Sequence, residues 1–370
     1  MADFELGFLG GGQLARMSIQ AAQRMGFRCL SLDPGEITPA SQISPAVKGN
    51  LDDPEALSAI FAQCDYITLE NEFVPAKAIA EAIKKTGRQP ESITPGLETL
   101  ATIQDKLTQR EALLKAGVPS PKAVALDQDG SLALAKIGIP MVLKARFGGY
   151  DGKGTRYART PEEFDQHTHL WQSGGEWLAE EYVPFKRELA VMVVRSKGGT
   201  ACFPTMETIQ TNHVCDIVKP ADVDASTIAI QAVEAVGGFG VFGVELFETN
   251  DGKFLINEIA PRPHNSGHYS LDWGGPSQFD QHIRAVLGLP PAPMDGIPTA
   301  MANVLGIEGA GDWRPAAVKM MVKDPGARFH WYGKAEAKPG RKMGHINATG
   351  ADCEARVREA RETFLDAWKA

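Results

Sequence analysis

Two glutamates, Glu245 and Glu258, are spaced so that a single β-hairpin would bring their carboxylates together. Apolar runs at 241–247 and 254–259 flank an Asn-Asp-Gly triplet, and Asp-Gly is a strong signal for a two-residue hairpin turn. With Asp-Gly as the loop, the two glutamates lie opposite each other on one face. Like charges in that position destabilise a sheet. A shared proton or a divalent cation with oxygen ligands, such as Mg²⁺, would relieve the repulsion, and the cation fits better. The alternative is a solvated face with two unrelated glutamates.

Basic and amide side chains follow the second strand of this hairpin. Arg262, His264, Asn265 and His268 stand among small and rigid residues. Guanidinium and imidazole groups bind anions through charge-assisted hydrogen bonds. The sequence therefore predicts an anion site beside the metal.

A glycine-rich loop at 148–154 has four glycines within seven residues. Such a loop can bring backbone N–H groups close to phosphates and can move as a lid. Lys144, on a predicted strand just before it, can supply a point charge to the same phosphates. The loop is neither a Walker A sequence nor a kinase loop. A mobile surface turn is the alternative, but Tyr150, Asp151 and Lys153 offer a hydroxyl, a carboxylate and a cation, which is unusual for a bare linker.

The segment Gly10-Gly11-Gly12-Gln13-Leu14-Ala15 matches the pattern G-x-G-x-x-A between a predicted strand and a predicted helix. An acidic residue, Asp33, follows at about the spacing of the dinucleotide fingerprint. The physical content of that fingerprint is a helix N-terminus near an anion, which any phosphate satisfies. An NAD-dependent enzyme is one interpretation, but no constellation for hydride transfer follows.

Three weaker signals remain open. The segment 180–183 lies in a predicted strand, and Glu188 begins the next predicted strand. Backbone groups of the first strand could bind the edge of a purine, and a carboxylate could accept hydrogen bonds from the hydroxyls of a ribose. The alternative is a strand end exposed to solvent. His213 stands beside Cys215, but a metal site there lacks further ligands at useful spacing. The basic pair in the segment 338–345 suits either a phosphate site or a plain basic turn.

Composition excludes several classes of protein. With 370 residues the chain is long enough for two or three domains. A net charge of −8 without a basic run argues against a nucleic-acid partner. Five scattered cysteines without a CxxC pair indicate a reducing compartment. The acidic start MADFE and the lack of a long apolar run predict neither signal peptide nor membrane span, so we expect a cytoplasmic protein.

Strands and helices alternate in the first hundred residues of the chain. This alternation predicts an open parallel sheet over about residues 1–100, whose ligands bind at the carboxyl ends of the strands. The glycine turn, Asp33 and Glu70-Asn71-Glu72 would therefore surround one crevice. The expected strands are 6–9, 28–32 and 66–69, and the expected helices are 13–25, 54–64 and 75–85.

The rest of the chain has a different character. A helix over 105–116 ends at a glycine that is a natural C-cap. A compact unit to about residue 179 contains a strand at 141–145. Strands dominate after residue 177, apart from a helix at about 225–236. The tail, 294–370, is expected to be a small β-rich unit closed by an amphipathic helix over 352–368.

Taken together, the motifs GGGQLARM, ENEFVP, GGYDGKG, NEIAPRPHNSGHYS and PGRKMGH resemble the ATP-grasp superfamily. The resemblance is closest to the N5-carboxyaminoimidazole ribonucleotide synthetases and covers essentially the whole chain. GGGQL alone is a weak signal, whereas NEIAPRPHNSGH after GGYDGKG is highly specific.

The resemblance implies an α/β and α+β protein with the ATP-grasp fold. A Rossmann-like N-terminal domain (1–103) would precede a small lid domain (104–179) and a larger mixed C-terminal domain (180–370) that includes the β-rich tail from about 294. ATP would bind between the last two domains, and the enzyme would be a homodimer. The implied reaction joins 5-aminoimidazole ribonucleotide, bicarbonate and ATP through carboxyphosphate, giving the N5-carboxylated ribonucleotide, ADP and phosphate.

The same resemblance implies roles for individual residues. Glu245 and Glu258 would hold Mg²⁺. The implied ATP contacts are Lys106, Lys144, Gly149, Tyr150, Asp151, Gly152, Lys153, Gly154, Thr155, Glu180, Glu181, Tyr182, Val183, Glu188, His213, Asn257 and Glu258. The implied contacts to bicarbonate and carboxyphosphate are Arg262, His264 and Asn265. The implied contacts to the ribonucleotide are Gly12, Gln13, Leu14, Glu72, Tyr150, Asp151, Lys153, Arg341 and Lys342, with the glycine turn on the monophosphate side.

Some alternatives stay open within this interpretation. Arginine is common in the family at the position of Lys153, which puts bidentate contacts there in doubt. Asp151 could act in catalysis by accepting a proton from the amine, and released phosphate could do so instead. A formate-dependent glycinamide ribonucleotide transformylase is the rival within the superfamily, but the segment 263–268 favours the carboxylase. A catalytically silent nucleotide-binding scaffold is disfavoured because every expected polar group is present.

Overall fold

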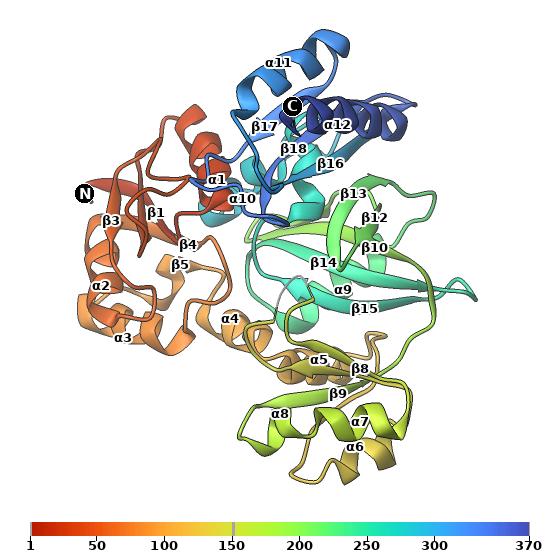
Figure 1. Cartoon of the computed structure of the whole chain (residues 1–370). Coiled ribbons are helices and arrows are strands. Elements are labelled where there is room, and N and C mark those ends of the chain that lie inside the picture. The colour runs from red at the N-terminus through yellow and green to blue at the C-terminus, as the bar shows by residue number, and fades with distance from the viewer. Residues whose placement is uncertain (1, 150–151, 370) are drawn as a thin grey trace.

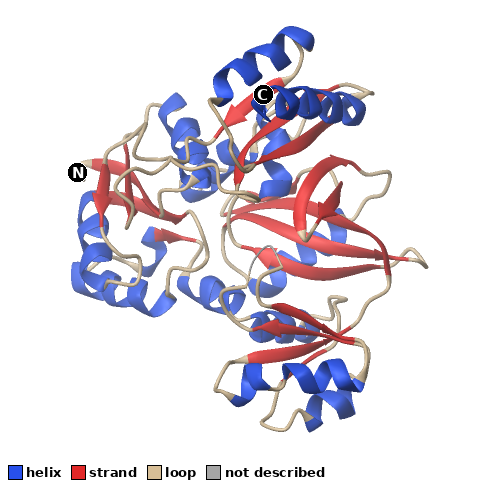
Figure 2. Cartoon of the chain, viewed as in Figure 1, coloured by secondary structure: helices blue, strands red, loops and turns tan. Residues whose placement is uncertain are grey.

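A computed structural model describes residues 2–149 and 152–369. It contains three sheets of five, four and nine strands. In Figure 1 the N-terminal sheet stands at the left, the four-stranded sheet at the bottom, and the nine-stranded sheet runs from the centre to the C-terminal helices at the top. Figure 2 shows that helices cover the outer sides of the two smaller sheets.

The predicted N-terminal parallel sheet is confirmed, in the order β3-β2-β1-β4-β5. Its strands pair so that Leu9 lies beside Leu69, which brings the glycine turn next to Glu70. The strands are β1 (Phe4–Leu9), β2 (Cys29–Asp33), β3 (Ala46–Lys48), β4 (Cys64–Leu69) and β5 (Ile93–Thr94). The helices are α1 (Gln13–Arg24), α2 (Pro54–Gln63) and α3 (Ala76–Thr86), and the short 3-10 helix η1 is Pro90–Ser92.

The four-stranded antiparallel sheet, in the order β6-β9-β7-β8, has three short helices on its outer side (Figure 1). Strand β9 ends at Glu181, so Tyr182 and Val183, which were predicted to lie in this strand, follow its end. The elements here are β6 (Ala123–Ala125), β7 (Met141–Ala145), β8 (Thr155–Ala158), β9 (Trp177–Glu181), α6 (Ser131–Lys136), α7 (Pro161–His167) and α8 (His169–Gln172). Two helices, α4 (Leu97–Gln104) and α5 (Lys106–Lys115), lead into it.

The nine-stranded sheet carries most of the predicted site. Strand β10 begins at Phe185, so Glu188 lies inside this strand and not at its start. Its first strands are β10 (Phe185–Ser196), β11 (Gly199–Cys202), β12 (Met206–Thr211), β13 (Val214–Pro220), β14 (Gly240–Thr249) and β15 (Phe254–Ala260). The adjoining helices are α9 (Ser226–Val236), the 3-10 helix η2 (Asn265–Leu271) and α10 (Gln278–Val286).

The tail is β-rich and closed by a helix, as expected, but its strands continue the nine-stranded sheet. Strand β13 pairs with β16, which extends the sheet through β18 to β17. Helix α11 was not predicted from the sequence. The tail elements are β16 (Thr299–Leu305), α11 (Trp313–Lys323), β17 (Arg328–Trp331), β18 (Lys342–Thr349) and α12 (Cys353–Lys369).

One buried cluster joins the N-terminal sheet to the rest of the molecule. Phe8 and Leu14, from β1 and α1, pack in the same cluster as Phe279 and Ile283 of α10. This shared core sets the position of the glycine turn relative to the nine-stranded sheet. Within the parts of the chain that the structure describes, no helix combines the length and apolar character needed to cross a membrane.

Candidate active site

The hairpin β14–β15 places Glu245 directly opposite Glu258, as predicted, but by a different route. The predicted two-residue loop is wrong. The loop has three residues, because the Thr249 N–H donates to the Lys253 carbonyl at 2.9 Å, and Gly252 has a φ of +77°. That loop alone would shift the register by one residue. A β-bulge between the glutamates and the loop restores it.

The bulge also decides which side chains face the site. Ile256 and Ile259 are both in the buried core although they are three residues apart. Regular alternation would put them on opposite faces. Because the bulge absorbs the extra residue, Asn257 and Glu258 both line the cavity.

A cavity of about 1070 Å³ lies between the three sheets and brings the predicted residues together. Tyr150 and Asp151 lie outside the described residues. The predicted residues that line the cavity are Gly12, Gln13, Leu14, Glu72, Lys106, Lys144, Gly149, Gly152, Lys153, Gly154, Thr155, Glu180, Glu181, Tyr182, Val183, Glu188, His213, Glu245, Asn257, Glu258, Arg262, His264, Asn265, Arg341 and Lys342.

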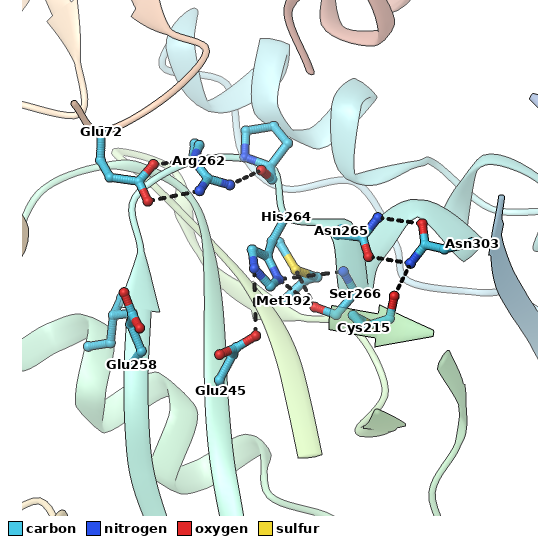
Figure 3. Close-up of polar contacts among 12 residues, drawn as sticks. Glu72, Met192, Cys215, Glu245, Glu258, Arg262, His264, Asn265, Ser266 and Asn303 are labelled. Carbon is cyan, nitrogen blue, oxygen red and sulfur yellow. Dashed lines mark hydrogen bonds and ion pairs between the residues drawn. The ribbon is translucent and has the colours of Figure 1, made fainter. Parts of the chain in front are cut away.

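The two facing glutamates have different neighbours. Glu258 forms an ion pair with Lys106. Glu245 instead has His264 as a neighbour, with Nε2 3.7 Å from Oε1 (Figure 3). Burial, followed by the charge of Glu258, raises the pKa of Glu245 to about 7. Lys106 thus relieves part of the repulsion for which the sequence analysis invoked a cation.

On the nucleotide side of the predicted site, Glu180 has a structural role. It is buried at 2% exposure, with Arg110 Nε and Lys144 Nζ each 2.7 Å from its carboxylate. Burial alone would raise the pKa of Glu180, but these two cations lower it to about 2. Lys144 also donates to Asn257 Oδ1 at 3.2 Å. The Glu180 carboxylate therefore positions Lys144.

The glycine lid lies against a tight turn between β12 and β13. His213, with a φ of +63°, occupies this turn. Gly152 has a φ of +75°, and a Cβ there would come within 2.8 Å of His213 Cβ. Gly152 of the lid and His213 therefore pack closely at one wall of the cavity.

On the anion side, Arg262 and His264 are both held in defined orientations. Arg262 forms a bidentate ion pair with Glu72, with Nη2 2.8 Å from Oε1 (Figure 3). His264 Nδ1 accepts a hydrogen bond from the Ser266 N–H at 3.4 Å. Nδ1 also lies 2.9 Å from Ser266 Oγ, and Nε2 faces Glu245. In the tautomer that accepts the Ser266 N–H, Nε2 carries the hydrogen.

Asn265 uses its amide differently from the expectation. Its Nδ2 donates to Asn303 Oδ1 at 3.0 Å, and Asn303 Nδ2 donates back to Asn265 Oδ1 at 2.7 Å (Figure 3). Asn303 is buried and also donates to the Cys215 carbonyl. The Asn265 amide thus ties η2 to β16, and an anion could use only its second N–H.

The glycine turn is a poor phosphate site in this structure. The Gly11 N–H donates to Asp33 Oδ2 at 2.8 Å, and the Leu14 N–H donates to Glu70 Oε1 at 3.3 Å. A Cβ on Gly12 would come within 2.3 Å of Glu70. Two amides at this helix N-terminus therefore already serve carboxylates, which disfavours the expected monophosphate contact there.

Some residues that line the cavity were not assigned a role by the sequence analysis. They include Glu70, Asn71, Phe73, Tyr157, Gln210 and Lys334. The position of Glu70-Asn71-Glu72 after a predicted strand placed this segment at the crevice, but only the structure shows that Glu70 accepts from the N-terminus of α1. Lys334 lies near the predicted basic pair and donates to the Lys342 carbonyl at 2.7 Å. A single lysine shortly after a strand does not by itself indicate a binding site.

Comparison with known families accounts for nearly the whole chain. The ribonucleotide synthetase preATP-grasp domain matches residues 4–104, the ATP-grasp domain residues 111–279, and the phosphoribosylaminoimidazole carboxylase C-terminal domain residues 299–359. The N5-carboxyaminoimidazole ribonucleotide synthase of Synechococcus elongatus is 40% identical over 377 residues, covering 97% of this chain and 93% of that protein.

The chain belongs to the N5-carboxyaminoimidazole ribonucleotide synthase family. A solved N5-carboxyaminoimidazole ribonucleotide synthetase with ADP superposes with a TM-score of 0.88 at 33% identity, covering 100% of this chain and 99% of the other. The Aspergillus clavatus N5-carboxyaminoimidazole synthase, solved with ADP and 5-aminoimidazole ribonucleotide, gives a TM-score of 0.87 at 32% identity, covering 98% and 99%.

These relationships confirm the predicted ATP-grasp fold and the predicted enzyme class. The protein is an ATP-dependent ligase that forms a C–N bond. Its reaction is the carboxylation of 5-aminoimidazole ribonucleotide to N5-carboxyaminoimidazole ribonucleotide in purine biosynthesis.

Proposed function

We propose that the enzyme uses bicarbonate as its carbon source and activates it as carboxyphosphate at the Glu245–Glu258 pair. One observation carries the proposal. The two glutamates stand between Lys106 and Lys144 on one side and Arg262 and His264 on the other, all in one cavity. A γ-phosphate held by the lysines and a bicarbonate held by the basic pair would meet there.

Magnesium fits this position. Burial and the neighbouring carboxylate make two ionised glutamates unfavourable together, so a bound cation stabilises the ionised pair. Among the residues that the structure describes, no group of three or more His, Cys, Asp or Glu side chains forms a metal cage. Glu245 and Glu258 would therefore share Mg²⁺ with the ATP phosphates, and the metal would neutralise charge on the transferring phosphoryl group.

Arg262 and His264 would bind the bicarbonate. Arg262 Nη1 donates one hydrogen to the Pro263 carbonyl at 3.2 Å and has a second N–H; this N–H and the His264 Nε2–H suit the oxygens of a planar anion. A bicarbonate oxygen attacks the γ-phosphorus of ATP and ADP leaves. The C–O bond to phosphate then breaks, releasing phosphate and delivering CO₂ to the amine of the ribonucleotide. A C–N bond forms and the amine loses one proton, either to phosphate or to Asp151.

Lys153, Arg341 and Lys342 would hold the ribonucleotide against the N-terminal domain, where Gly12, Gln13, Leu14 and Glu72 line the facing wall. Tyr150 is proposed for the same substrate from the family resemblance. Because carboxylates use the amides of the glycine turn, we assign the monophosphate to the basic wall. The nucleotide would bind to the lid residues Gly149–Thr155, to Glu181–Val183, and to Glu188 and His213.

We also propose three features of the whole enzyme. The division at about residue 103 is supported by the preATP-grasp match, which ends at residue 104, and the division at about residue 179 by the four-stranded sheet, whose last strand in the chain, β9, ends at Glu181. A homodimer is proposed from the family resemblance, and light scattering would measure its mass. A cytoplasmic location is supported by the five cysteines, all of which are free.

Release of ADP tests the reaction. We expect release that requires bicarbonate and is stimulated by 5-aminoimidazole ribonucleotide, with one phosphate formed per ADP. Removal of bicarbonate by degassing in the presence of formate should stop the reaction. Formate-dependent turnover on glycinamide ribonucleotide would instead identify the rival transformylase activity and contradict the proposal.

A further inference from the structure

A buried glutamine on α10, Gln278, is paired with the backbone of His264. Its Oε1 accepts from the His264 N–H at 2.9 Å, and its Nε2 donates to the His264 carbonyl at 2.9 Å. The side chain is completely buried. A single amide thus binds both backbone polar groups of one residue, as a neighbouring strand would. His264 lies just after β15, between the strand and η2.

A third bond fixes the orientation of this amide. Nε2 also pairs with Nδ1 of the buried His268 at 2.8 Å. Burial lowers the pKa of His268 well below its usual value, so its ring is neutral and Nδ1 can accept. Since both N–H groups of Gln278 are donated and its oxygen accepts, a flipped amide would lose these bonds.

Gln278 is itself held firmly. Its backbone N–H donates to Ser270 Oγ at 2.9 Å, and Ser277 and Asp280 form a capping box at the start of α10. A Cβ on Gly267 would come within 2.5 Å of Gln278 Oε1, so η2 packs directly against the amide. The amide therefore has little freedom to follow a displaced His264.

We propose that Gln278 is a positioning residue for bicarbonate binding, acting through the backbone of His264. The proposal rests on the assignment of bicarbonate to Arg262 and His264 made above. Gln278 does not line the cavity, so its effect on substrate must pass through the residues that it contacts. His264 and His268 both line the cavity, and of these two it is His264 whose backbone N–H and carbonyl are both bound by the Gln278 amide. By fixing both backbone groups, it sets the direction in which the His264 ring presents Nε2–H to the cavity.

The same helix offers a matched control. Gln281 is also completely buried, accepts from the Ala292 N–H at 3.0 Å and donates to the Ala292 carbonyl at 2.9 Å. It therefore makes the same two-way contact with a backbone, but with a segment that does not line the cavity. Gln278→Met and Gln281→Met both leave a half-buried backbone N–H and carbonyl without these partners, at a similar cost in stability.

The test compares steady-state kinetics of the two methionine variants. For Gln278→Met we expect the KM for bicarbonate to rise by about tenfold, with the KM for Mg-ATP changed by less than about twofold. For Gln281→Met we expect both constants within about twofold of the parent enzyme, despite a similar fall in Tm. Equal effects of the two variants on the KM for bicarbonate, or no effect of Gln278→Met, would overturn the proposal.

Two further variants keep the result interpretable. Gln278→Glu has the same shape and still accepts from the His264 N–H, but its carboxylate cannot donate to the carbonyl or to His268. It should give the same selective rise in the KM for bicarbonate and replaces the methionine variant if that protein does not fold. His264→Asn distinguishes the proposed role of His264 in binding bicarbonate from the proposed role of Gln278 in positioning His264. If it leaves the KM for bicarbonate unchanged, the proposed role of His264 fails. If it raises that KM and Gln278→Glu does not, only the positioning role fails.

Discussion

At the scale of single residues, the site is organised around two carboxylates that repel each other. Lys106 forms an ion pair with Glu258, and Glu245 has the raised pKa. If ATP draws Lys106 to its phosphates, Glu258 becomes available to a cation that also stabilises ionised Glu245. The repulsion thus favours a cation when nucleotide is bound.

Replacing Glu258 by alanine should abolish turnover while preserving the fold. The variant loses one of the two proposed metal ligands and leaves Lys106, only 15% exposed, without its partner. We expect kcat to fall by at least about a hundredfold, the size of effect seen when stabilisation of transition-state charge is lost. ADP release would measure this, with circular dichroism as the control for folding. Near-parental ATPase activity in a folded variant would show that the metal assignment is wrong.

A second prediction concerns stability and pH. The folded protein holds a proton on Glu245 up to about pH 7, whereas the unfolded chain releases it near 4.5. The folded state therefore binds more protons between these values, so this group makes the protein less stable as pH rises from 4.5 to 7. Without nucleotide or metal, Glu245→Gln should be more stable than the parent at pH 8 by about 1–3 kcal/mol and gain little at pH 4.

Urea unfolding at the two pH values measures this difference. Asp222→Asn is a useful control, because that carboxylate is exposed and its ion pair with Arg187 lowers its pKa. A gain for Glu245→Gln that is the same at pH 4 and pH 8 would contradict the proposed cost of ionising Glu245.

At the scale of elements, the sequence predicted which glutamates face each other but not how. The Asp-Gly signal located the turn, yet a three-residue loop and a bulge replaced the simple hairpin. The sequence does contain a signal for the bulge, since the spacing of Ile256 and Ile259 breaks the period of two that apolar residues follow in a regular strand. The reciprocal Asn265–Asn303 pair and the Arg110–Glu180–Lys144 group had no such signal, because their partners come from distant segments.

The lid gives a prediction at this scale. Gly148 and Gly152 both have a left-handed backbone, with φ of +72° and +75°. A Cβ on Gly148 meets nothing within 4 Å, whereas one on Gly152 approaches His213. Both alanine variants carry a similar backbone strain of about 1–2 kcal/mol, so Gly148→Ala controls for it. We expect Gly152→Ala to raise the KM for Mg-ATP several-fold more than Gly148→Ala does. Equal effects would show that the contact with His213 is unimportant.

At the scale of the whole molecule, segments that are far apart in the sequence join the sheets to one another. Alternation of strands and helices was enough to predict the N-terminal sheet, because its pairing follows from local pattern and chain order. The union of the tail with the nine-stranded sheet was not predictable in this way, since β13 and β16 are far apart in sequence. Nor did the sequence reveal that α10 shares a core with β1 and α1.

This shared core predicts cooperative unfolding. Phe279 is completely buried among residues of the N-terminal domain, including Phe8 and Leu14. Phe279→Ala should therefore destabilise both regions together, by about 3–5 kcal/mol, and scanning calorimetry should show a single transition at a lower temperature. Phe164→Ala is the matched control, because that ring is equally buried but packs within the four-stranded lid sheet. If Phe279→Ala instead splits the transition and leaves an N-terminal component at the parental temperature, the domains unfold independently and α10 does not couple them.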